Sequence, residues 1–117
     1  MSYNAIADKS FKFAIRIVNL HKYLRDSKNE FIMSKQVVRC GTSIGANVAE
    51  AEKAQSTPDF YTKLTIALKE ANETHYWLKL LNATEYLNNE EFNSIDKEAC
   101  ELIALLVSIT KSLKDQI

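Results

Sequence analysis

Both glycines of this chain, Gly41 and Gly45, lie in one stretch that has the sequence pattern of a helix interior. A glycine there costs roughly 1 kcal/mol relative to alanine, so its presence needs a structural reason. Gly41, Gly45 and Ala49 recur every four residues and form a smooth stripe along one side of the helix. Such a stripe lets another backbone approach closely, either within the same chain or between subunits.

The composition favours an all-α protein. Hydrophobic residues make up 46% of the 117 residues and charged residues 26%, with two glycines and one proline, whereas sheet proteins use many more glycines and prolines in their turns. The length predicts a single domain over residues 1–117. No run of 18 apolar residues is present and the N-terminal segment is charged, so we expect neither a membrane span nor a secretion signal.

The first segment, from about Asn4 to Asp26, has two apolar stripes on nearly opposite sides. The first stripe consists of Ile6, Phe13, Ile17, Leu20 and Leu24. The second consists of Phe11, Ile15 and Val18. A helix in an isolated bundle needs only one buried stripe, so the second predicts a homo-oligomer.

The next two segments also have helix signals. Ser34 is the expected N-cap of a helix that runs to about Ala54, with Met33 and Val38 as a hydrophobic staple. Its predicted core face is Val37, Ile44, Val48 and Ala51. Thr57 is the expected cap of a third helix that ends near Ala83, because Pro58 suits the first helical position. Its predicted buried stripe is Phe60, Leu64, Leu68, Ala71, His75 and Leu78.

The last segment has the most regular pattern in the chain. Asn88 and Glu91 form a predicted capping box at its start. Apolar residues then follow at spacings of three and four, as in the seam of an antiparallel bundle: Phe92, Ile95, Ala99, Leu102, Leu106, Ile109 and Leu113. The four segments and their short connections predict an antiparallel up-down-up-down four-helix bundle.

A set of polar residues is expected to meet across the second and third helices. An antiparallel turn near residues 55–57 places Arg39 opposite Glu73 and Thr74, Ser43 opposite Glu70, and Glu50 opposite Lys63. We call this set the polar ladder: Arg39, Ser43, Asn47, Glu50, Lys63, Glu70, Glu73 and Thr74. Either it fixes the register of the two helices or it forms a ligand or acid–base site.

Metal binding and enzymatic chemistry are not indicated. Cys40 and Cys100 are far apart, no C-x-x-C pattern occurs, and His21 and His75 are distant from both in sequence, so no metal or cofactor is predicted. Reduced, buried thiols fit a cytoplasmic protein. His75 is expected to pack rather than to ligate. No phosphate-binding glycine loop, nucleophile elbow or zinc spacing is present, and no small-molecule substrate is evident.

The net charge is zero, but the charged residues are unevenly distributed along the chain. Through residue 40 the chain has eight Lys/Arg against three Asp/Glu, and the remainder has seven against twelve. Either the two halves attract each other on folding or the first helix presents a basic functional surface. In the second case the nucleic-acid-binding residues would be Lys9, Lys12, Arg16, Lys22 and Arg25.

Trp77 and the stripe of small residues on the second helix complete the predicted subunit interface. Trp77 lies off the main apolar stripe of its helix, where it would either stack on a base or pack against a neighbouring subunit. The predicted subunit interface comprises Phe11, Ile15, Val18, Gly41, Gly45 and Trp77.

The segments 43–51, 59–64, 67–74 and 76–78 resemble, in order and spacing, the bacterial four-helix-bundle family of 23S rRNA intervening-sequence proteins, also labelled S23 ribosomal proteins. The resemblance spans essentially the whole chain. It implies a cytoplasmic, non-enzymatic homopentamer related to the accessory variability protein of diversity-generating retroelements, which binds nucleic acid. The S23 label reflects genes within insertions in ribosomal RNA genes, not demonstrated membership of the ribosome.

With this resemblance, we expect a self-assembling accessory or scaffold protein that associates with RNA or structured DNA. The alternative is a protein–protein adaptor that binds no nucleic acid. Salt separates the two, because phosphate binding weakens steeply as salt rises and apolar docking weakens less.

Overall fold

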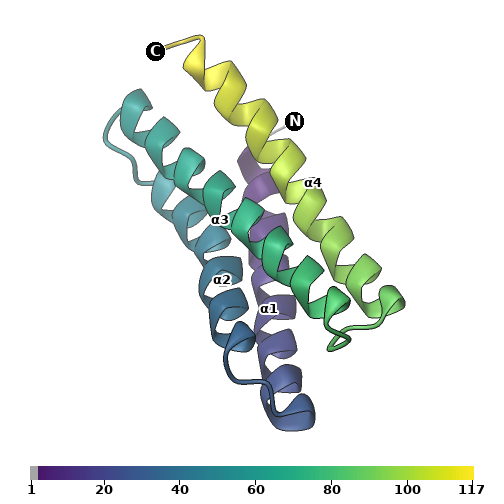
Figure 1. The fold of residues 1–117 in the computed structure, drawn as a ribbon. Coiled ribbons are helices and arrows are strands. Elements are labelled where there is room, and N and C mark those ends of the chain that lie inside the picture. Colours follow the sequence, from purple (N-terminus) through teal and green to yellow (C-terminus); the bar gives the residue numbers. More distant parts are fainter. Residues whose placement is uncertain (1–2) are drawn as a thin grey trace.

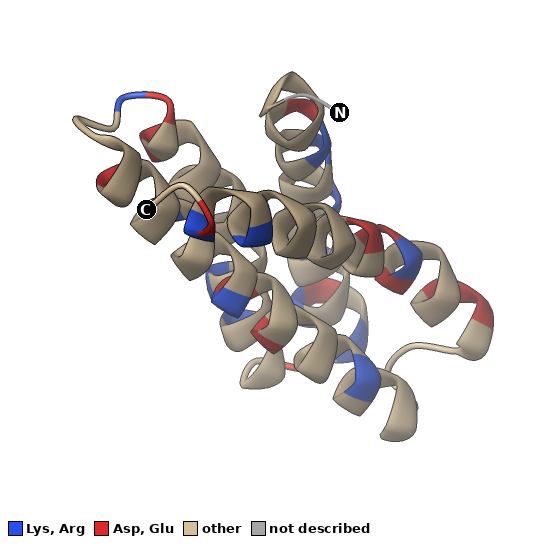
Figure 2. Cartoon of the chain, turned by 90° about the horizontal axis from the view of Figure 1, so that it is seen from above, with Lys and Arg blue, Asp and Glu red and all other residues tan. Residues whose placement is uncertain are grey.

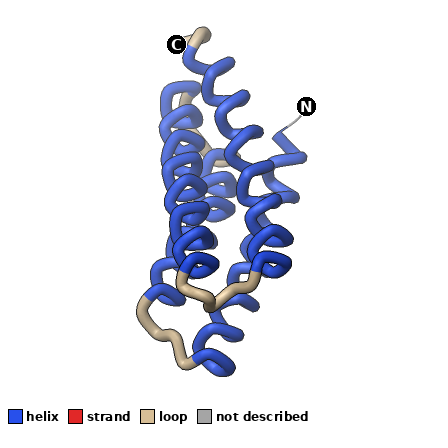
Figure 3. Tube along the Cα trace, turned by 45° about the vertical axis from the view of Figure 1, so that its right-hand side comes forward, coloured by secondary structure: helices blue, strands red, loops and turns tan. Residues whose placement is uncertain are grey.

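The chain folds into four helices that run up and down beside one another (Figure 1). The computed structural model describes residues 3–117. The helices are α1 (Tyr3–Lys28), α2 (Met33–Ala51), α3 (Thr57–Ala83) and α4 (Asn89–Lys114). Short turns join them, and the described residues contain no strand (Figure 3). The prediction of an all-α, antiparallel up-down-up-down four-helix bundle is confirmed.

The core follows the predicted stripes on three of the helices. All five residues of the first stripe of α1 are buried, as is the predicted core face of α2. On α4 the centre of the seam is buried at Ile95, Ala99, Leu102 and Leu106. The ends of that seam are partly exposed at Phe92, Ile109 and Leu113. These stripes meet in one hydrophobic cluster shared by all four helices.

The buried side of α3 differs from the predicted stripe. Ala67 and Thr74 are fully buried, whereas Phe60, Leu68 and His75 are only partly buried. The buried Thr74 lies against α2, with its hydroxyl 3.2 Å from the sulfur of Cys40. The next residue, His75, lies on the side of α4, where it meets Asp96 in a polar contact instead of filling the centre of the core.

Two predicted helix starts are wrong in detail. The N-cap of α3 is Ser56 rather than Thr57, and its hydroxyl accepts the backbone N–H of Asp59. Ser34 is not the N-cap of α2, because that helix already begins at Met33. The expected staple of Met33 and Val38 therefore does not form at an N-cap. By contrast, the capping box of Asn88 and Glu91 at the start of α4 is confirmed.

A buried carboxylate performs the capping at α2. Glu30, in the turn after α1, accepts the backbone N–H groups of Ile32, Met33 and Ser34 at 3.2, 3.0 and 2.7 Å. The Ser34 hydroxyl in turn donates to the Glu30 carbonyl. A negative charge at this position also suits the positive end of the helix dipole. The sequence analysis missed this cap because Glu30 precedes the helix, where a short side chain is the usual cap.

Candidate nucleic-acid interface

Three predicted basic residues lie together where α1 faces α4. At 100° per residue, Lys9, Lys12 and Arg16 fall within about 60° of one another around α1. Together with Ser94, Lys97, Glu98, Glu101 and Leu102 of α4 they line a cavity of about 680 Å³. We call this cavity the α1–α4 groove.

The groove contains anions as well as cations. Arg16 donates to Glu98 at 2.5 Å and to the side chain and carbonyl of Ser94 at 3.1 Å. Lys12 pairs with Asp8 at 3.1 Å, and both side chains are largely exposed. Among the described residues, Lys9 and Lys97 form no ion pair. Lys9 and Lys97 are thus the groove cations most available for an external anion, and Lys12 becomes available when its exposed pair with Asp8 opens.

The other two predicted basic residues do not join this groove. Arg25 lies about 160° around α1 from Lys9. It pairs with Asp26 at 2.7 Å, and this hydrogen bond raises the pKa of Arg25. Arg25 lines a different cavity, beside the start of α2. Lys22 is exposed on the same side of α1 as Arg25. The five residues therefore do not form one continuous patch, and Figure 2 shows acidic and basic residues interspersed along the helices.

The second apolar stripe of α1 faces solvent in the isolated chain. Phe11 is 68% exposed, Ile15 50% and Val18 37%. On the helix this stripe lies opposite the buried one, so it cannot be covered by the other helices of the same bundle. This exposure is what the homo-oligomer prediction requires of a single subunit.

The two glycines face α1 of the same chain. A Cβ at Gly41 would lie 2.7 Å from Ile17 Cγ2, and a Cβ at Gly45 would lie 3.2 Å from the Ser10 carbonyl oxygen. Ala49, the third member of the stripe, is exposed. The structure thus places the close approach within the bundle, between α1 and α2, rather than at a subunit interface.

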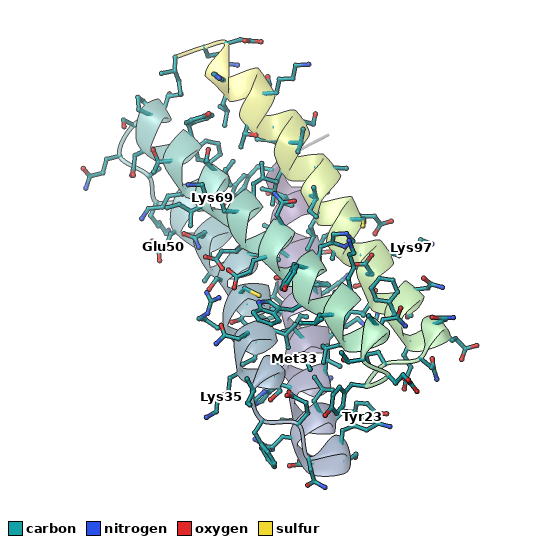
Figure 4. All side chains as sticks on the ribbon, in the orientation of Figure 1. Tyr23, Met33, Lys35, Glu50, Lys69 and Lys97 are labelled. Carbon is teal, nitrogen blue, oxygen red and sulfur yellow. The ribbon has the colours of Figure 1, made fainter. Side chains whose placement is uncertain are left out.

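The polar ladder divides into bonds between helices and bonds within them. Arg39 of α2 pairs with both Glu70 and Glu73 of α3, and Glu50 pairs with Lys63 at 3.0 Å. Figure 4 labels Glu50 on α2, close to the turn that leads to α3. The pairs at the two ends of the ladder lie in the register expected from the turn.

The remaining ladder residues bond locally. Ser43 donates to the Arg39 carbonyl at 2.7 Å, and Asn47 donates to the Ser43 carbonyl at 2.8 Å, so both bonds stay within α2. Thr74 is fully buried and donates to the Glu70 carbonyl, with Cys40 Sγ 3.2 Å away. Burial raises the pKa of the Cys40 thiol.

Trp77 extends the ladder at its edge. Its indole N–H donates to Glu73 at 3.1 Å, and its ring lies edge-on to Tyr76 with centroids 5.2 Å apart. Trp77 is partly buried, whereas Tyr76 is 56% exposed. Trp77 packs against the core of its own chain, so of the two rings only that of Tyr76 is exposed enough to contact a partner surface.

A cluster that the sequence analysis did not find lies between α3 and α4. His75 Nδ1 is 2.7 Å from one oxygen of Asp96, and Cys100 Sγ is 3.6 Å from the other. Burial and the neighbouring Asp96 raise the pKa of the Cys100 thiol. Two signals could have revealed the cluster: Asp96 and Cys100 are four residues apart, and His75 and Asp96 are almost equally distant from the turn between their helices.

The fold and these surfaces define a class: a small antiparallel helical bundle with an exposed apolar stripe and a mixed-charge groove. Within residues 3–117, every helix is too short or too polar to span a bilayer. Residues 3–108 match the family model for the 23S rRNA-intervening sequence protein. The chain belongs to this family.

Among solved structures, a similar one is a crystal structure of a protein with unknown function from the S23 ribosomal protein family of Bacteroides thetaiotaomicron VPI-5482. The two sequences are 58% identical, and the TM-score is 0.93. The match covers 95% of this chain and 99% of the other. Among curated proteins, none matches this chain.

Proposed function

We propose that this chain is a cytoplasmic, non-enzymatic, self-assembling bundle that associates with nucleic acid as an accessory or scaffold protein. RNA is the nucleic acid that we favour. The observation that carries the proposal is the group of solvated cations at the α1–α4 groove, on a side of α1 that the core does not use. The family name refers to an intervening sequence of 23S rRNA, which makes RNA the first ligand to test.

The groove favours weak and sequence-independent binding. Lys9, Lys12 and Lys97 supply mobile positive charges that suit phosphates, which carry no sequence information. Glu98 offsets Arg16, and Glu101 adds a further negative charge to the groove. A single subunit should therefore bind RNA weakly at physiological salt.

Self-assembly would provide the missing affinity. Burying the stripe of Phe11, Ile15 and Val18 between subunits would repeat the groove around the assembly, and linked sites bind with avidity. The family resemblance implies five subunits. Size exclusion with light scattering tests this part of the proposal, and a monomer at micromolar concentration contradicts it.

The binding test compares two surfaces with equal charge loss. One variant carries Lys9→Gln and Lys12→Gln at the groove, and its control carries Lys69→Gln and Lys79→Gln, two exposed lysines of α3 away from both the groove and the α1 stripe. We expect the first variant to bind a labelled RNA hairpin and a DNA duplex more weakly. Its log–log salt slope should fall by about 1.4–1.8, the value for two lost phosphate contacts. Equal losses in both variants would show that only overall charge matters.

A protein–protein adaptor is the second candidate. Besides the α1 stripe, Phe31, Ile32 and Tyr76 are more than half exposed, and apolar residues of this size serve as anchors in protein interfaces. If the parent protein does not bind either nucleic acid at low salt, the adaptor function replaces the first proposal.

A further inference from the structure

The cluster between α3 and α4 brings together three different kinds of ligand atom. One ring nitrogen of His75, a carboxylate oxygen of Asp96 and the sulfur of Cys100 all lie within 4.8 Å of one another. His75 belongs to α3, while Asp96 and Cys100 are one turn apart on α4. The three side chains therefore converge from both sides of a helix–helix contact.

We propose that His75, Asp96 and Cys100 form a binding site for a divalent transition metal, with Zn²⁺ as the favoured ion. Zn²⁺ accepts imidazole nitrogen, thiolate sulfur and carboxylate oxygen together, whereas Mg²⁺ and Ca²⁺ prefer oxygen alone. A thiolate among the ligands selects softer metals. Three protein ligands leave a fourth position for water, as in open zinc sites.

The geometry needs only small adjustments. Around a tetrahedral Zn²⁺, neighbouring ligand atoms lie about 3.4–3.6 Å apart, given the usual metal–ligand bond lengths. Cys100 Sγ and the nearer Asp96 oxygen are 3.6 Å apart, and His75 Nδ1 and the other Asp96 oxygen are 2.7 Å apart. Binding would thus require side-chain rotations that separate His75 from Asp96 and bring the His75 nitrogen and the Cys100 sulfur, which lie within 4.8 Å of each other, to the same spacing.

Accessibility also suits a metal. The side chain of Asp96 is 12% exposed and that of His75 34% exposed, and Cys100 is exposed. An ion can enter from the Cys100 side and meet a carboxylate that is already largely desolvated and held by a hydrogen bond. A bound cation would also stabilise the thiolate, because a coordinating thiol loses its proton.

A cysteine nucleophile is a poorer interpretation of the same residues. In Cys–His enzymes the imidazole lies next to the sulfur and takes its proton, and a third group orients the imidazole. Here Asp96 lies between the other two, hydrogen-bonded to His75 on one side and to Cys100 on the other. A carboxylate beside the sulfur disfavours the thiolate unless a cation is present.

The test uses Co²⁺ as a spectroscopic substitute for Zn²⁺ on the full-length, reduced protein. We expect one Co²⁺ per chain, with a thiolate-to-cobalt charge-transfer band and the visible bands of a tetrahedral site. Zn²⁺ should displace Co²⁺ and raise the midpoint of thermal unfolding, because the metal bridges two helices of the folded state.

Variants separate the site from the rest of the protein. Cys100→Ser should abolish the charge-transfer band, and Cys100→Ser and Asp96→Asn should each weaken Zn²⁺ binding by more than about 100-fold, since loss of a residue that only orients a ligand already costs 10–100-fold. Circular dichroism verifies that each variant is folded. The matched controls are Cys40→Ala and His21→Gln, which remove the other cysteine and the other histidine and should leave binding unchanged.

Two results would overturn the proposal. One is the absence of a charge-transfer band when the folded wild-type protein is saturated with Co²⁺. The other is a Cys100→Ser variant that binds Zn²⁺ as tightly as the wild type. Neither result depends on RNA binding, so this proposal can fail or succeed independently of the proposed function.

Discussion

Consecutive helices of this bundle meet closely, whereas the first and last helices meet across an open groove. α1 and α2 approach so closely that a Cβ at Gly41 would overlap Ile17 and a Cβ at Gly45 would lie tightly against the Ser10 carbonyl. α1 and α4 touch at far fewer positions than any consecutive pair, and Arg16 reaches across the groove to Ser94 and Glu98. In Figure 1, α4 slants across α1 rather than running alongside it.

The difference shows how tight and loose helix contacts can be combined within one small bundle. The close α1–α2 contact depends on stiff or backbone atoms, such as those of Ile17 and Ser10, which cannot move aside cheaply. α1 and α4 also contribute to the shared core, but at the surface they are joined by long charged side chains such as Arg16 and Glu98, which can be rearranged with little loss of stability. Substitutions should therefore lower the free energy of unfolding strongly at the α1–α2 contact and only weakly at the α1–α4 contact.

The largest effect is expected at Gly41. Gly41→Leu should destabilise the fold by about 3 kcal/mol, because even its Cβ would overlap Ile17. Ala49→Leu, on the exposed continuation of the same stripe, should stay within about 0.5 kcal/mol. Urea unfolding at one fixed protein concentration measures both. Similar losses in the two variants would show that the close approach is not what makes this region rigid.

Next in size is the cap at the α1–α2 turn. Glu30→Ala should cost about 1–2 kcal/mol, since it leaves three backbone N–H groups at the start of α2 without their acceptor. Glu30→Gln, which keeps one oxygen acceptor, should recover part of this loss. The measurement is again urea unfolding. If Glu30→Ala leaves the free energy of unfolding unchanged, water caps α2 equally well.

A smaller effect is expected for the ion pair between α2 and α3. Arg39 and Glu73 are 50% and 37% exposed, which places them in the class of surface pairs rather than buried ones. A double-mutant cycle with alanine at each position should give a coupling free energy of about 0.2–1 kcal/mol. A value near 3 kcal/mol would reveal burial of the pair in the assembled protein, and no coupling would leave Arg39 available for another role.

The smallest effect is expected for the corresponding pair across the groove. Arg16 and Glu98 are 39% and 37% exposed, so they too form a surface ion pair. Because α1 and α4 contact each other less than α2 and α3 do, we expect a coupling at the low end of the surface range, about 0.2–0.5 kcal/mol, which falls as salt is added. A cycle at two salt concentrations measures it. A coupling larger than that of Arg39 and Glu73 would contradict the view that the α1–α4 side is only loosely held.

Much of the fold could be predicted because its signals are local or periodic. The buried stripe of α1 and the capping box of Asn88 and Glu91 depend on spacing along one helix, and the structure confirms both. The cap of α2 was missed because Glu30 acts from within a turn whose path no periodicity describes. The spacing of His75 fits the apolar stripe and so predicts a core position, but the side chain is only partly buried and meets Asp96 of α4, a partner that spacing along α3 does not reveal.

The candidate sites were less predictable, because they depend on which helices become neighbours. The sequence indicated that Lys9, Lys12 and Arg16 share a side, but not that Glu98 and Glu101 would face them from α4. It placed Lys22 and Arg25 in the same binding set, whereas the structure puts Arg25 beside a separate cavity at the start of α2. Cations of the first half do meet anions of the second half, at Arg16 and Arg39.

By itself, the sequence determined the number of helices, their antiparallel order and most of the core, because hydrophobic periodicity and short turns leave few other arrangements. Tertiary structure alone decided that the glycines serve the α1–α2 contact, that the groove opens between α1 and α4, and that His75, Asp96 and Cys100 converge. These features depend on the rotation and crossing of whole helices. Many contacts set those angles together, and no single segment encodes them.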